Sequence, residues 1–119
     1  MKHKIKIPEG LTMEGLEIGL PKGKPFEVDT LERIIEFINT HFKPRGSISY
    51  YQNSLDLKCI VERCFDNEIR ISNGELIAAM ILCGYKYVRI TPKSKNCHFN
   101  VCRISKKKER AITSQMALE

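Results

Sequence analysis

Residues 71–90, ISNGELIAAMILCGYKYVRI, decide the fold because they predict a helix with a defined start and end that leads into a strand. Ser72 and Glu75 have the spacing of a capping box, and Gly84 suits the position just after a helix. Residues 76–83 carry no charge, although 29% of the chain is charged. A helix that is apolar all round is buried, so we expect this one at the centre of the core.

Two amphipathic helices are expected before this central helix. Asp29 begins the first, and Asn53 or Ser54 begins the second, which has Glu62 on its solvent face. Their apolar stripes follow helical spacing. The stripe residues are Leu31, Ile34, Ile35, Ile38 and Phe42, then Leu57, Ile60, Val61, Cys64 and Phe65. Both stripes predict helices that pack on a common core.

The β-structure is expected mainly after the central helix. Residues 85–90 and 97–104 are two β-rich runs around a polar loop that contains proline, which predicts a hairpin. A short strand is expected at residues 2–7 from their alternating pattern. We expect residues 45–53 to form a loop or short extended piece, and residues 69–71 a small strand.

These elements predict an α+β fold, a three-helix winged-helix-like domain with a C-terminal β-hairpin and a short N-terminal strand. Three helices followed by a hairpin is the element order of a winged helix. One compact domain is expected over residues 1–104, with the N-terminal strand and irregular segment in 1–28 and the helices and hairpin in 29–104. Residues 105–119 are expected to be a basic, flexible tail.

The central part of this sequence resembles a known group of proteins. Residues 53–87 are similar to short uncharacterised proteins of bacteriophages and other mobile elements. The matching residues are Ser54, Leu57, Lys58, Glu62, Ser72, Asn73, Gly74, Leu76, Ile77, Ala79, Met80, Gly84 and Tyr85; Cys59 stands where that pattern usually has His. A weaker resemblance is to winged-helix domains of viral primases. The resemblance implies a mobile-element context and brings no activity with it.

The net charge of +6 is concentrated at the ends of the chain. Residues 1–7 contain three lysines, and residues 103–110 contain five bases and one acid. Residues 8–102 have 12 bases and 12 acids. A basic end of this kind is either a phosphate-binding arm or a solvated terminus.

The central helix has few side chains that could read base edges. If nucleic acid binds, the hairpin and tail are expected to hold it through phosphate contacts, with weak sequence specificity and strong salt dependence. The expected contact residues are Arg89, Lys93, Lys95, Arg103, Lys106, Lys107, Lys108 and Arg110.

Tyr50 and Tyr51 follow Arg45 in the segment between the first two helices. Exposed tyrosine with arginine is typical of protein interfaces, and tyrosine can also stack on bases. One of the rings could instead cover the edge of the core. Two hypotheses of function therefore remain. The first is a small, basic, non-enzymatic nucleic-acid-binding protein of a phage or mobile element, which contacts mainly the phosphate backbone. The second is a protein-binding inhibitor or adaptor that acts on a host complex such as a defence nuclease.

An enzyme is not expected. His3, His41 and His98 have no nucleophile or carboxylate at a catalytic spacing, and no phosphate-cradling glycine motif is present. No cofactor is expected.

The chain has five cysteines, an odd number, and no Cys-x-x-Cys motif. This pattern favours reduced thiols over disulfides. A metal site at Cys97, His98 and Cys102, with Cys59 or Cys64, is the alternative, but no zinc-site spacing supports it. The longest apolar run, residues 76–83, is too short to span a bilayer, and no apolar run follows the basic start. A cytoplasmic protein is expected.

Overall fold

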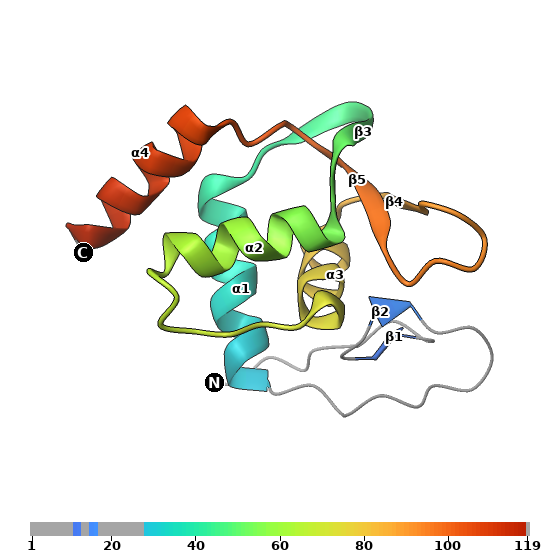
Figure 1. Ribbon diagram of the computed structural model, residues 1–119, viewed down its shortest axis with the longest axis horizontal. Coiled ribbons are helices and arrows are strands. Elements are labelled where there is room, and N and C mark those ends of the chain that lie inside the picture. Colours follow the sequence, from blue (N-terminus) through green and yellow to red (C-terminus); the bar gives the residue numbers. More distant parts are fainter. Residues whose placement is uncertain (1–10, 13–14, 17–27, 119) are drawn as a thin grey trace.

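The computed structural model describes residues 11–12, 15–16 and 28–118 (Figure 1). The expected strand at residues 2–7 lies outside this part of the chain. The helices are α1 (Val28–His41), α2 (Ser54–Cys64), α3 (Asn73–Leu82) and α4 (Lys106–Ala117). The strands are β1 (Leu11–Thr12), β2 (Gly15–Leu16), β3 (Pro44–Asn53), β4 (Tyr87–Arg89) and β5 (Cys97–Val101). The α+β class is confirmed. Among the described residues, no helix is long and apolar enough to cross a membrane.

The central helix, α3, begins and ends where the sequence predicts. Ser72 Oγ accepts a hydrogen bond from the Glu75 N–H at 3.0 Å, and the Glu75 carboxylate accepts one from the Ser72 N–H at 2.8 Å. Gly84 has φ of +92°, and the Tyr85 N–H reaches back to the Met80 carbonyl at 3.0 Å. This is the Schellman arrangement that glycine favours because it has no Cβ.

The core forms around α3, as expected. Residues 76–80 of this helix are 0% exposed, and α3 contacts both α1 and α2. The predicted stripes of α1 and α2 are buried against it, with Ile35 and Phe65 partly buried at the edge. β1 and β2 form a small antiparallel pair that also contacts α3. Neighbours on several sides explain why this helix needs no polar face.

A three-stranded antiparallel sheet with strand order β3-β5-β4 lies beside the helices. The predicted hairpin is confirmed, because Val88 pairs with His98 and Arg89 pairs with Cys97. Residues 45–53, where a loop or short extended piece was expected, belong to the ten-residue strand β3. β3 has no simple alternation of apolar and polar residues, and its pairing with β5 joins segments far apart in the sequence.

Three local predictions around α1 and α2 need correction. α1 begins at Val28, so Asp29 lies inside its first turn. Residues 69–71 form no strand. Glu62 is buried and does not face solvent, because its carboxylate accepts the Ile71 N–H at 3.0 Å and also pairs with Lys58. The Glu62 carboxylate therefore satisfies the Ile71 N–H, which would otherwise need a partner in a neighbouring strand.

The segment expected to be a flexible tail forms helix α4 instead. Ser105 caps it by accepting the Lys108 N–H at 3.1 Å. Ile112 is buried against the core, and Arg63 of α2 makes two hydrogen bonds to Glu109, at 2.8 and 2.9 Å. The folded domain therefore extends past residue 104 and includes α4. The many lysines of this segment make its one buried position, Ile112, hard to recognise from sequence.

Candidate nucleic-acid interface

The most exposed aromatic side chains of the described part lie in a bulge of β3, residues 49–53. Ser49 pairs with Phe99, but Asn53 pairs with His98, so four steps along β3 match one step along β5. The surplus residues have no pairing partner on β5, as is usual for the extra residues in a bulge. Tyr50 and Tyr51 are each 70% exposed as a result. Neither ring covers the edge of the core.

Each tyrosine touches a nitrogen-bearing side chain from β5 or the segment after it. The Arg103 guanidinium lies over the Tyr51 ring, 4.4 Å from its centroid. The ring centroids of Tyr50 and His98 are 5.1 Å apart, in a tilted arrangement. The structure thus joins Tyr51, expected in a protein interface, with Arg103, expected to bind phosphate. Arg45 is exposed at the start of the same strand.

Side-chain amides fix the backbone around the bulge. The Gln52 amide donates to the Ile104 carbonyl at 2.8 Å and accepts the Ile104 N–H at 2.9 Å. Asn100 bridges the sheet by donating to the Arg45 carbonyl and accepting the Lys86 N–H. These bonds tie β3 to β5 and to the segment after β5, on both sides of the exposed tyrosines.

The loop between β4 and β5, residues 90–96, joins the two strands of the predicted hairpin and is called the wing. Arg89 at its base is half-buried and donates to the Ser94 carbonyl at 2.6 Å, so this side chain helps to shape the loop. Lys93 and Lys95 are exposed. Asn73, at the start of α3, donates to the Asn96 side chain at 2.7 Å and holds the wing against the helix layer.

The remaining predicted basic residues lie apart from the wing. Figure 1 shows α4 and the β4–β5 loop well separated along the long axis of the molecule. Lys106, Lys107 and Arg110 are exposed on α4, and Lys108 is half-buried. Arg103 lies between the two regions in sequence and is exposed beside Tyr51. The eight predicted basic residues therefore do not form one cluster.

A segregation of charge becomes visible only once the sheet is assembled. Residues 37–55 and 76–108, which contain every strand of this sheet and both its connections to α2 and α4, hold no Asp or Glu. The bases on these strands and connections are Lys43, Arg45, Lys86, Arg89, Lys93, Lys95 and Arg103. The net charge summed over residues 8–102 conceals this pattern, because all 12 acids of that range lie in residues 8–36 and 56–75. The long acid-free run at 76–108 was the available signal.

The first eight of the ten residues of α3 are not available to enter a DNA groove. Its residues 73–80 are all buried, and β1 and β2 contact the helix in addition to α1 and α2. A groove-reading helix must present side chains to base edges. The side chains of α3 are therefore unsuited to direct readout of base edges.

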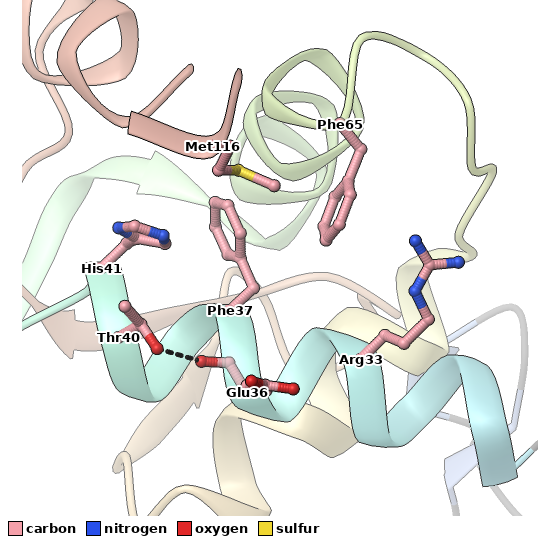
Figure 2. A pocket seen from close by; sticks show the side chains of 7 residues that line it. All are labelled: Arg33, Glu36, Phe37, Thr40, His41, Phe65 and Met116. Carbon is pink, nitrogen blue, oxygen red and sulfur yellow. Dashed lines mark hydrogen bonds between the residues drawn. The ribbon is translucent and has the colours of Figure 1, made fainter. Parts of the chain in front are cut away.

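A pocket of about 170 Å³ lies between α1, the end of α2 and α4 (Figure 2). Phe37, Phe65 and Met116 form its apolar side, while Arg33 lies 5.2 Å from the centroid of the Phe65 ring. The Thr40 hydroxyl donates to the Glu36 carbonyl at 2.8 Å. This volume is below that of typical ligand pockets, about 300–1,000 Å³.

A second hollow of about 540 Å³ adjoins the first and shares Phe65 and Met116 with it. Asp66 and Glu68 line it, which makes it unfavourable for phosphate. Both hollows lie against the C-terminal half of α4 and reflect its light packing there.

Cys64, Cys83 and Cys97 have the environment of structural thiols. Burial raises the pKa of Cys97 to about 12 and that of Cys83 to about 11, so both stay protonated near neutral pH. Burial also raises the pKa of Cys64. Within the described part of the chain, no group of three His, Cys, Asp or Glu side chains is arranged to hold a metal ion.

No protein-family model, curated protein or solved structure matches this chain.

Proposed function

We propose that this chain is a small non-enzymatic nucleic-acid-binding protein with a winged-helix-like arrangement, from a phage or other mobile element. The observation that carries the proposal is the basic sheet, whose strands and connections offer a polyanion several cations and contain no Asp or Glu of their own. The order of three helices and a hairpin supports the winged-helix part of the proposal. The proposed setting is the cytoplasm, with no cofactor.

Binding would depend mainly on phosphate contacts. Lys93 and Lys95 lie on the wing, Arg103 follows β5, and Lys106 and Lys107 lie at the start of α4. Such contacts position nucleic acid without reading its sequence, so affinity should fall steeply with added salt. Arg89 contributes more through the shape of the wing, because its guanidinium is bonded to Ser94.

The test is a titration of labelled nucleic acid with the full-length protein at two or more salt concentrations. Replacing Lys93 and Lys95 together by alanine should weaken binding and reduce the slope of log K against log salt by about 1.5. Arg70→Ala is the control, because Arg70 is exposed in the α2–α3 connection, outside the acid-free segments. Failure of the unmodified protein to bind any nucleic acid at low salt would refute the proposal.

A protein-binding inhibitor or adaptor of a host complex, such as a defence nuclease, is the second candidate. Tyr50 and Tyr51 beside Arg103 favour it, because tyrosine and arginine dominate the energetics of many protein interfaces. Stoichiometric capture of one host protein, lost on replacement of both tyrosines, together with no nucleic-acid binding, would select this candidate. A lysate pull-down that recovers no stoichiometric protein would count against it.

A further inference from the structure

Tyr50 and Tyr51 are far more exposed than tyrosines that stabilise the core. Each side chain is 70% exposed, so neither adds much to the core. Tyr85 provides the contrast, since it is only 8% exposed and its burial raises its pKa to about 12. The two adjacent rings lie on a strand bulge and face solvent. Bulges often redirect side chains next to functional sites, so this arrangement indicates a binding surface.

The surroundings of the rings suit an anionic, aromatic ligand. One face of Tyr51 is covered by the Arg103 guanidinium, while its 70% exposure leaves much of the ring open. A base stacked on that open surface would bring its phosphate within range of a cation that is already in place. The strand that carries both rings belongs to the sheet that lacks acids.

We infer that this surface binds single-stranded nucleic acid, with bases stacked on Tyr50 and Tyr51 and the backbone held by Arg103. The inference rests on the proposed function and narrows its substrate class. A duplex hides the faces of its bases by pairing and stacking them, so exposed rings gain little from it. The buried α3 removes the element that would have favoured a duplex.

The site explains why the bulge is clamped so firmly. Gln52, the residue after the two tyrosines, bonds both backbone groups of Ile104 and thereby fixes Arg103 one position away. The Tyr51 ring and the guanidinium above it are thus positioned from two segments, β3 and the chain after β5. A stacking platform set in advance loses less conformational entropy when a base binds.

The experiment measures fluorescence anisotropy of the full-length protein with labelled oligothymidylate of about 12 nucleotides, a length within the range of one small domain. Oligouridylate and a duplex of the same length are run in parallel. We expect either single strand to bind more tightly than the duplex, and the tighter one assigns the ligand as DNA or RNA. Tyr50→Leu and Tyr51→Leu should each weaken single-strand binding by about 5- to 100-fold.

Tyr51→Phe is the matched control, because it retains the ring and should keep the affinity within about twofold. Duplex binding that equals or exceeds single-strand binding would overturn this inference and leave the proposed function standing. Tighter single-strand binding that neither leucine substitution changes would overturn the stacking site. Absence of binding to all three oligonucleotides would overturn both the inference and the proposed function.

Discussion

α3 and the β3 bulge differ in nearly every respect. α3 is apolar and capped at both ends by short-range hydrogen bonds, and its residues 76–80 are fully buried. The bulge is aromatic and exposed, and the strand that contains it departs from regular pairing. The difference teaches that the helix most like a DNA reader by position serves the core, while the segment expected to be a loop carries the surface suited to binding.

The largest expected effect comes from breaking α3. Ile77→Ala leaves a cavity beside a residue that is 0% exposed, so the free energy of unfolding should fall by about 2–5 kcal/mol. Urea denaturation measures it. Leu118→Ala serves as control, because this side chain is 89% exposed and its loss should change stability very little. A loss below about 1 kcal/mol for Ile77→Ala would contradict the central role assigned to α3.

A smaller effect is expected for Gln52→Ala. This substitution removes the amide that satisfies the N–H and C=O of the buried Ile104, which should cost about 1–3 kcal/mol. Urea denaturation gives the magnitude, and faster amide hydrogen exchange at Ile104 locates it. Gln115→Ala, at an exposed position on α4, is the comparison variant. Equal stability of the two variants would show that the bulge needs no clamp.

The Arg63–Glu109 ion pair between α2 and α4 should contribute less to the free energy of unfolding than Gln52 does, and its contribution should disappear at acidic pH. The hydrogen-bonded Arg63 guanidinium holds the pKa of Glu109 below its ordinary value of 4.5. The stabilisation is therefore complete above pH 4.5 and is lost as the pH falls through the lower, folded-state pKa. Because Arg63 is half exposed, Glu109→Gln should cost only about 0.5–1 kcal/mol at neutral pH.

Urea denaturation of the parent and Glu109→Gln proteins at several pH values checks this contribution. The difference in unfolding free energy should shrink as the solution becomes more acidic than pH 4.5. A difference that stays constant over that range would rule out the ion pair as its source.

The smallest effect on stability is expected at the tyrosines. Tyr50→Ala and Tyr51→Ala should each change the free energy of unfolding by no more than about 0.5 kcal/mol, because both rings lie mostly in solvent. Thermal denaturation followed by circular dichroism is sufficient. A loss of about 2 kcal/mol or more would mean that the rings support the fold, and the contrast with α3 would disappear.

α3 could be predicted from sequence because its signals are local. Ser72, Glu75 and Gly84 act within one turn of the residues they cap, and the apolar run between them leaves burial as the consistent interpretation. The hairpin was predictable for a similar reason, since its two strands are joined by a short loop.

β3 and α4 could not be predicted in the same way. β3 exists through pairing with β5, and its two register shifts remove the alternation that marks a strand. α4 has a serine cap at Ser105, but three lysines follow it and Ile112 is its only buried residue. The segment therefore lacks the apolar stripe that usually indicates a packed helix. The acid-free segments are visible in the sequence, but that they meet in one sheet follows only from the strand order.

The irregular pairing of β3 has a further consequence, for solubility. With strand order β3-β5-β4, both β3 and β4 are edge strands, whose unpaired backbone groups can recruit strands from other chains. β4 is only three residues long, which limits that risk. β3 has ten residues, but its register shifts prevent a long, straight edge. The distortion that exposes two tyrosines therefore also makes this edge a poor template for aggregation.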